Sequence, residues 1–190
     1  MRRIILPILL LLAPSAHAAC DIAGFGTDRD PAGTNIRATP GGTAIGRLPA
    51  PIKRDDTLLP VEFRITDIHG DWIRIHAAEY GAYFPRTPRF HFAGPGWVHA
   101  SLAATQTGSH RLRAAPKADA PTVVELSGTD KDGNGWGADS ITIRRIHACD
   151  GKFAEVTVKL PTGQQARGWV RNTCSNQVTT CDGYDPDEDD

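Results

Sequence analysis

The segment "GPGWVHA" (Gly94–Ala100) returns later in the chain as "ARGWVRN" (Ala166–Asn172). Gly-Trp-Val is therefore written twice, 72 positions apart, in a chain of 190 residues. A tripeptide that contains tryptophan and recurs at this distance suggests an internal repeat of a small structural unit. The segments on either side of the two copies decide whether the whole chain is organised in this way.

Two other landmarks recur in the same order as Gly-Trp-Val. Residues 35–40 match residues 111–116 at an offset of 76, and residues 65–69 match residues 143–147 at an offset of 78. Phe153 then stands in the second copy where Trp72 stands in the first. Two copies are too few for a solenoid, so the pattern predicts two small domains in tandem.

Each copy has the pattern of β-strands. Val61, Phe63 and Ile65 alternate with polar residues, which is typical of a half-buried strand. The phase then slips by one residue between Ile65 and Ile68, and the second copy slips in the same way from Ile143 to Ile146. A shared slip predicts a β-bulge, and "HGDW" (residues 69–72) predicts a tight turn after it. No segment carries a long helical stripe, so the sequence predicts an all-β fold of short, bent strands.

The sequence resembles the bacterial SH3-like (SH3b) domain family. The resemblance is carried by "GTNIRATPGGTAIGRL" (33–48), "IHGDWIRI" (68–75) and "GPGWVHASL" (94–102), and by a degenerate second set that ends in Gly168-Trp169-Val170. It covers roughly residues 30–175. It implies two tandem small SH3-like β-barrels, in which the repeated Gly lets the backbone pass closely, the Trp fills the barrel and the Val continues the last strand. We expect the first barrel over residues 19–106, with an aromatic insertion at 76–93, and the second over 107–182.

The resemblance also implies a function, because members of this family are mostly non-catalytic modules that bind cell-wall peptides or other proteins. The chain carries no G-x-S-x-G elbow, no H-E-x-x-H motif and no Gly-rich phosphate loop. We therefore expect a protein that is not an enzyme, a binding module of the periplasm or envelope that recognises a peptide of the cell wall or of a partner protein. The alternative is an envelope protein that inhibits or assembles a partner by occlusion. A hydrolase would require a pocket with clustered polar groups.

The insertion in the first copy supplies the candidate binding residues. It is longer than the equivalent segment of the second copy and is rich in aromatic residues and arginine. Aromatic side chains beside arginine can form a recognition surface, with arginine pairing to a ligand carboxylate. The alternative is that the same aromatic side chains cover the barrel or pack against the other domain. The candidate ligand-binding residues are Tyr80, Tyr83, Phe84, Arg86 and Arg89.

A second candidate site is a weak match to a calcium loop. Asp130, Asp132 and Asn134 occupy positions 1, 3 and 5 of "DKDGNG", with glycine at position 6. Position 12 is Ile141, where a bidentate Glu is required, so an ordinary Asp/Asn/Gly turn is the favoured interpretation. We expect no cofactor, and only weak Ca²⁺ binding if this loop binds a metal.

Residues 1–18 have the pattern of a secretory signal peptide. Arg2 and Arg3 precede an apolar run, and Ala16-His17-Ala18 is a small-x-small cleavage signal, which predicts cleavage near Ala18 and a periplasmic or secreted product. A lipid anchor at Cys20 is disfavoured, because His17 stands where a lipobox has leucine. The sequence has no second apolar run that would predict a membrane span. A formal net charge of −1 does not predict a basic surface for binding nucleic acid. Residues 183–190 are predicted to form an acidic, disordered tail.

An exported chain with four cysteines predicts two disulfides and no free thiol. Four cysteines allow three pairings, and we favour one bridge within the second copy that includes Cys149. The four residues are Cys20, Cys149, Cys174 and Cys181.

Overall fold

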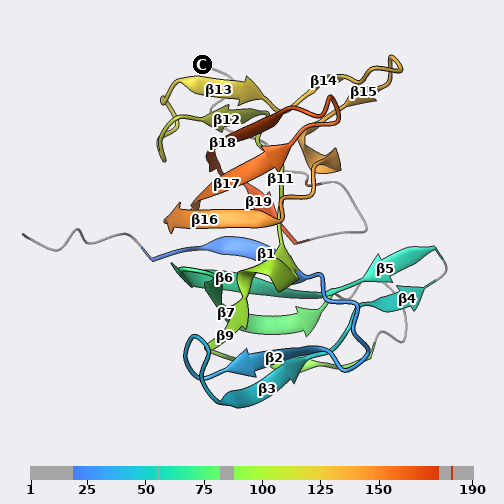
Figure 1. The fold of residues 1–190 in the computed structure, drawn as a ribbon, viewed down its shortest axis with the longest axis vertical. Coiled ribbons are helices and arrows are strands. Elements are labelled where there is room, and N and C mark those ends of the chain that lie inside the picture. Colours follow the sequence, from blue (N-terminus) through green and yellow to red (C-terminus); the bar gives the residue numbers. More distant parts are fainter. Residues whose placement is uncertain (1–18, 55, 82–87, 176–180, 182–190) are drawn as a thin grey trace, which may run out of the picture.

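The computed structural model describes residues 19–54, 56–81, 88–175 and 181 (Figure 1). Within these residues the chain is all-β, as predicted, and its helical segments are two short 3₁₀ turns, η1 (Ala100–Leu102) and η2 (Ala138–Ser140). The predicted signal peptide and acidic tail lie outside the described residues. No described helix is long and apolar enough to cross a membrane.

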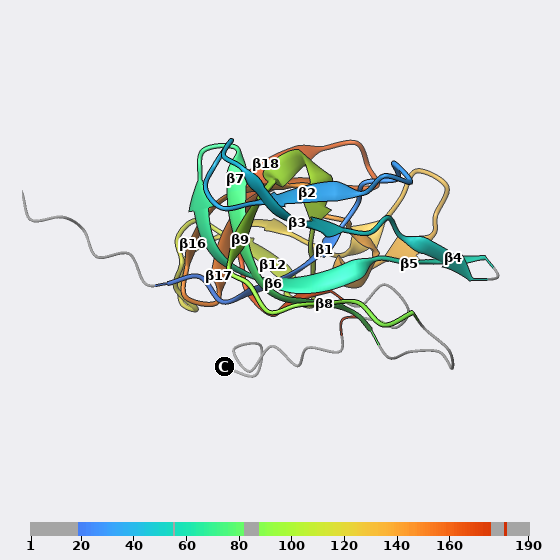
Figure 2. The same cartoon turned by 90° about the horizontal axis from the view of Figure 1, so that it is seen from below.

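The first half of the chain builds one antiparallel sheet with the order β10-β1-β6-β7-β9-β2-β3, and β8 pairs with β7 beside this path. A separate hairpin, β4–β5, projects from the body (Figure 2). The strands are β1 (Ile22–Gly26), β2 (Thr34–Arg37), β3 (Ala44–Leu48), β4 (Ile52–Arg54), β5 (Thr57–Leu59), β6 (Val61–His69), β7 (Trp72–Tyr80), β8 (His91–Phe92), β9 (Gly96–His99) and β10 (Ala103–Ala104).

The second half builds a five-stranded antiparallel sheet with the order β13-β12-β18-β17-β16. Two smaller pairs accompany it, β11 with β19 and β14 with β15. The strands are β11 (Gln106–Thr107), β12 (Arg111–Arg113), β13 (Thr122–Glu125), β14 (Gly128–Thr129), β15 (Gly135–Trp136), β16 (Arg145–Asp150), β17 (Phe153–Lys159), β18 (Gln165–Val170) and β19 (Thr173–Cys174).

The two sheets repeat one strand order. The path β6-β7-β9-β2-β3 of the first half is matched by β16-β17-β18-β12-β13 of the second, element for element. Arg37 lies opposite Trp97 in the first sheet, and Arg113 lies opposite Trp169 in the second. Neither sheet closes into a barrel within the described residues, because their outer strands, β10 and β3 or β13 and β16, remain apart in the pairing.

The bulges correct the alignment of the two copies. β6 shifts register between Ile65 and Asp67, as predicted, but β16 shifts between Ile146 and Ala148 rather than between Ile143 and Ile146. The structural equivalent of Ile65 is therefore Ile146, at an offset of 81. The turns agree with this offset, because Gly70 and Gly151 both adopt a φ of 56°.

The core lies on one face of each sheet. Ile73, Ile75 and Val98 are almost fully buried in the first half. In the second half Val156 is the counterpart of Ile75, and Val170 is the counterpart of Val98. These side chains belong to one cluster of buried residues that extends through both halves. The halves therefore share a continuous core.

The repeated glycine lets two strands approach closely, as predicted. A Cβ on Gly96 would collide with the side chain of Ile36, and one on Gly168 would lie 2.6 Å from the carbonyl oxygen of Arg113. The role predicted for the tryptophan is wrong. Trp97 is only half-buried, because it alternates with Gly96 and Val98 along β9 and therefore points to the outer face of the sheet.

Trp169 has the same half-buried position in β18, between the buried residues Gly168 and Val170. In both copies the residues that face the core are thus the glycine and the valine. The tryptophans belong to the opposite, outer face of each sheet.

All four cysteines form disulfides, as predicted, but the favoured pairing of Cys149 is wrong. Cys149 bonds to Cys20 and so links the two halves across 129 residues. The bridge within the second half joins Cys174 to Cys181. Two disulfides fit an extracytoplasmic location.

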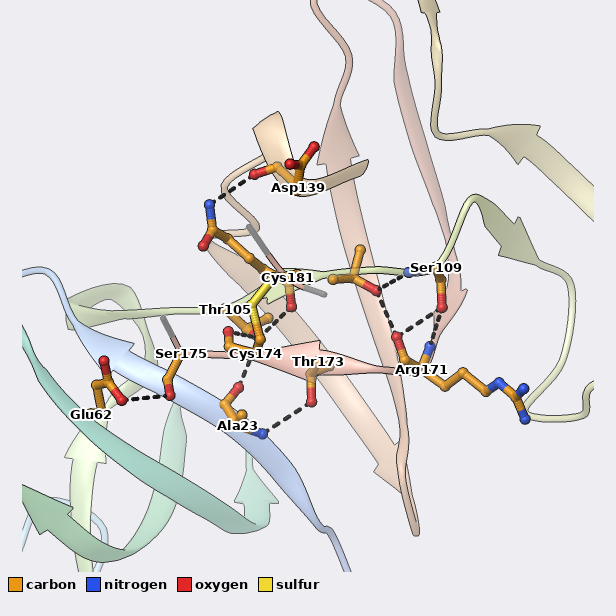
Figure 3. Close-up of a disulfide and its surroundings, with 12 residues drawn as sticks. Ala23, Glu62, Thr105, Ser109, Asp139, Arg171, Thr173, Cys174, Ser175 and Cys181 are labelled. Carbon is orange, nitrogen blue, oxygen red and sulfur yellow. Dashed lines mark hydrogen bonds between the residues drawn. A yellow bond between two sulfur atoms is a disulfide. The ribbon is translucent and has the colours of Figure 1, made fainter. Parts of the chain in front are cut away.

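Hydrogen bonds beside the Cys174–Cys181 disulfide reinforce the contact between the halves (Figure 3). The Thr105 hydroxyl donates to the carbonyl of Ala23 at 2.7 Å, and the N–H of Ala23 donates to the Thr173 hydroxyl at 3.0 Å. The Ser175 hydroxyl lies 3.0 Å from the carboxylate of Glu62. Strand β19 is therefore hydrogen-bonded to β1, and Ser175 to Glu62 on β6, so this segment of the second half is fastened to the first half.

Candidate functional site

The outer face of the first sheet carries a group of aromatic and basic side chains. Trp72 and Arg74 alternate with buried isoleucines on β7, Trp97 and His99 alternate with buried residues on β9, and Arg37 ends β2. Because neighbouring residues of a strand point to opposite faces, all five side chains stand on the side away from the core. We call this set the aromatic face. Each of the five is half-buried.

The side chains of the aromatic face contact one another across three strands. The rings of Trp72 and His99, a directly opposed pair, meet edge to face with centroids 5.3 Å apart. The Arg37 guanidinium lies 5.9 Å from the centre of the Trp72 ring, close enough for a cation–π contact. Trp97 lies directly opposite Arg74 on one side and opposite Arg37 on the other. The result is an aromatic surface, formed by Trp72, Trp97 and His99, that is bordered by the cations of Arg37 and Arg74.

The loop after β2 is held to this face by Arg37. Its guanidinium donates a 2.6 Å hydrogen bond to the carbonyl oxygen of Gly42, across the turn at residues 39–42. This bond holds the guanidinium beside the Trp72 ring.

The equivalent face of the second half has a different chemistry. Phe153 replaces Trp72 and Glu155 replaces Arg74, and Glu155 pairs with Arg167 at 2.9 Å. Arg113, the counterpart of Arg37, is 7% exposed and donates to the carbonyl of Ala120. On this face of the second half, Arg167 is paired with Glu155 and Arg113 is buried. Arg37 and Arg74 of the first half are half-buried beside two tryptophans and form no ion pair among the described residues.

No family model, curated protein or solved structure matches this chain. The functional assignment of the aromatic face therefore depends on its own geometry and chemistry.

A cleft of about 480 Å³ lies between the two halves, next to the aromatic face. It is lined by the equivalent bulges of the two copies, residues 66–68 and 147–149, together with Ala19, Cys20 and Arg74. We call it the inter-repeat cleft. Each of the two lining segments carries the β-bulge of its strand, where a strand bends locally.

Polar groups in the cleft are fixed by local hydrogen bonds. The Asp67 carboxylate accepts the N–H of Ile68 at 2.8 Å, and a ring nitrogen of His147 lies 2.8 Å from the Thr157 hydroxyl. Desolvation, with a smaller contribution from the cation of Arg167, lowers the pKa of His147 below its ordinary value and favours the neutral ring. Arg74 differs from these groups, because its guanidinium contacts no acceptor among the described residues.

The structure places the predicted ligand-binding residues in different environments. Tyr80 is 9% exposed, its hydroxyl donates to the carbonyl of Ala50 at 2.8 Å, and its ring meets Phe90 edge to face. Burial raises the pKa of the Tyr80 phenol. Phe92 also packs against the core. Arg89 is exposed. Tyr83, Phe84 and Arg86 lie outside the described residues.

The candidate calcium loop is a hydrogen-bonded turn between β14 and β15. The Asp130 carboxylate accepts the backbone N–H groups of Asp132 and Asn134, each at 2.9 Å, and these bonds lower the pKa of Asp130. Asp132 pairs with Lys131 at 2.7 Å. Among the described residues no group of three or more His, Cys, Asp or Glu could hold a metal ion. The Asp130 carboxylate is thus engaged by the backbone of the loop, and the Asp132 carboxylate by the Lys131 side chain.

The repeated Gly-Trp-Val did not predict the aromatic face. A recurring Gly-Trp-Val predicts a core position for the tryptophan in both copies, whereas Trp97 and Trp169 lie on the outer faces. The signal that identifies the outer face is the alternation itself: Trp72 and Arg74 are out of phase with Ile73 and Ile75. The cleft has no signal of this kind, because it depends on how the two halves pack.

Proposed function

We propose that this protein is a non-enzymatic binding module of the periplasm or envelope, exported by residues 1–18 and built from two SH3-like repeats. It recognises an extended peptide, from the cell wall or from a partner protein, on its aromatic face. Only the first repeat binds, and the second supports it. This assignment of roles is supported by the pairing of Glu155 with Arg167 and by the burial of Arg113.

The repeated strand order supports the SH3-like assignment. Both halves follow the same path of five strands, and the family-like motifs fall at equivalent places along it, with Arg37 opposite Trp97 and Arg113 opposite Trp169. Such order in two sheets of one chain is expected of a duplicated domain.

The observation that carries the function is the outward position of Trp72 and Trp97 between two arginines. Tryptophan and arginine are the residues that most often dominate binding energy at protein interfaces. A core role would have buried both rings, and here each keeps part of its surface in solvent beside a cation. A peptide chain that bears carboxylates matches this combination of aromatic area and positive charge.

Retention of the full chain on two materials tests this proposal: sacculi stripped of protein, and a synthetic library of short peptides. We expect the wild type to be retained on at least one. Trp97→Ala should weaken retention by roughly 30-fold, which corresponds to loss of about 2 kcal/mol at a central interface aromatic residue.

The matched control is Trp169→Ala, which removes the equivalent ring from the second half. We expect it to be retained like the wild type. Melting temperatures of both variants establish that each is folded. Wild-type protein that is retained on neither material, or equal losses for the two variants, would contradict the proposed function.

A further inference from the structure

We propose that the inter-repeat cleft is a carboxylate-binding subsite, and that Arg74 is the residue that binds the carboxylate. The inference rests on the proposed function, because the carboxylate is taken to belong to the peptide that lies on the aromatic face. It adds the place where that peptide ends or presents an acidic side chain, and it assigns a role to the junction between the repeats.

Arg74 is positioned between the two sites. On its own sheet it lies directly opposite Trp97, at the centre of the aromatic face, and directly opposite Asp67 on the other neighbouring strand. It also lines the cleft. A ligand that crosses Trp97 therefore reaches the cleft at Arg74 without leaving the surface of the sheet.

No carboxylate in the described part of the chain pairs with the charge of Arg74. The basic side chains Arg64 and Arg167 pair with Asp21 and Glu155, whereas the guanidinium of Arg74 contacts no acceptor among the described residues. Asp67 directs a carboxylate oxygen to the N–H of Ile68. A half-buried guanidinium with five donors and no acceptor among the residues that the structure describes is suited to an anionic ligand, and its planar fork matches a carboxylate.

The surroundings of Arg74 favour a monoanion of modest size. Asp67 contributes a negative charge nearby, which disfavours a dianion such as a phosphate monoester. The lowered pKa of His147 leaves that ring neutral near pH 7, so it supplies polarity but no second cation. Ala148 and the Cys20–Cys149 disulfide form an apolar wall. A volume of about 480 Å³ accommodates a terminal amino-acid residue together with solvent.

The test uses N-acetylalanine and its neutral amide as probes on the full chain labelled with ¹⁵N. In the wild type we expect saturable chemical-shift changes at the Arg74 side chain and at His147 with the carboxylate, and none with the amide. Arg74→Gln should weaken binding of the carboxylate by at least about tenfold, as expected for a hydrogen bond to a charged group. Arg47→Gln removes the same charge from the exposed strand β3 and should bind like the wild type.

A second variant keeps the test decisive if Arg74→Gln does not fold. Ala148→Leu fills the cleft and leaves the arginine in place, and we expect it to abolish the shift changes at His147. Equal responses to acid and amide, or unchanged carboxylate binding by both cleft variants, would overturn the subsite.

The outcomes separate this inference from the proposed function. N-acetylalanine is too short to cover the aromatic face, so its binding does not require Trp97. If Trp97→Ala loses peptide retention and Arg74→Gln does not, the proposed function stands and the subsite is overturned. Binding of N-acetylalanine by a chain that retains no peptide keeps the subsite as a site for small carboxylates and overturns the function.

Discussion

At the scale of single residues, His147 links the cleft to pH. Burial, followed by the cation of Arg167, lowers the pKa of this ring in the folded chain, while Glu155 acts in the opposite direction. A histidine whose pKa is lower in the folded state than in the unfolded state holds fewer protons when folded. Its contribution to stability is complete above the unfolded pKa of about 6.5 and is lost as the pH falls through that value toward the folded pKa.

We therefore expect the free energy of unfolding to decrease between pH 7 and pH 5, and we expect His147→Gln to reduce that decrease. Chemical denaturation at several pH values provides the measurement. His69→Gln, at the exposed end of β6, is the control for replacing a histidine outside the cleft. Asp130 does not interfere, because its lowered pKa affects stability only as the pH falls below about 3.8. An identical slope in His147→Gln would show that the ring is solvated.

At the scale of strands, the close approach at the repeated glycine fixes the pairing of β9 with β2 and of β18 with β12. A methyl group at Gly168 would meet the carbonyl oxygen of Arg113 at 2.6 Å and Leu112 Cγ at 2.9 Å. Backbone cannot move aside as a flexible side chain can, so Gly168→Ala should lower the free energy of unfolding by about 1–3 kcal/mol. Gly96→Ala should act in the same direction through Ile36.

Gly135→Ala is the matched control for the glycine variants. Its Cβ would meet nothing closer than the carbonyl oxygen of Gly128, at 4.0 Å. Urea unfolding of the three variants gives the comparison, and a loss at Gly135 as large as that at Gly168 would argue against a steric cause.

The same strands show what the sequence could predict. Period-two alternation located β6, and the phase slip after Ile65 located a bulge, because burial on one face of a sheet produces a regular pattern in residue order. The second slip was assigned three residues too early, since Ile143 and Ile146 imitate the spacing of Ile65 and Ile68. Only the pairing partners resolve it: Ile146 lies opposite Val156, as Ile65 lies opposite Ile75.

The candidate site was less accessible to sequence reasoning than the strands. The aromatic content of the insertion predicts a binding surface, yet Tyr80 is buried. It contacts Ala50, which is 30 residues away in the sequence, and Phe90, and no periodic pattern relates these residues to Tyr80. The cleft depends on how the two halves pack against each other, and the pattern of residues within one strand does not predict that packing.

At the scale of the whole molecule, the Cys20–Cys149 disulfide holds the halves together. It closes a segment of 129 residues, whereas Cys174–Cys181 closes one of 7. Loop entropy grows with the logarithm of length, so replacing Cys20 and Cys149 by Ser should cost about 5 kcal/mol, and replacing Cys174 and Cys181 about 2 kcal/mol.

Guanidinium unfolding of the two double variants, each with its other bridge intact, measures these costs. The shared core predicts a single transition for the wild type. A larger loss from the short bridge than from the long one would contradict the role assigned to Cys20–Cys149.

The connectivity of the disulfides has a consequence for biosynthesis. Numbered from the N-terminus, the first cysteine bonds to the second and the third to the fourth. As the chain emerges N-terminus first, the cysteine that follows Cys20 is its partner Cys149, and the cysteine that follows Cys174 is its partner Cys181. An oxidant that simply joins thiols in order of appearance produces the native pair set, and no bond needs to be broken and reshuffled afterwards. The cross-link that unites the two repeats is thus also one that maturation can form without a proofreading step.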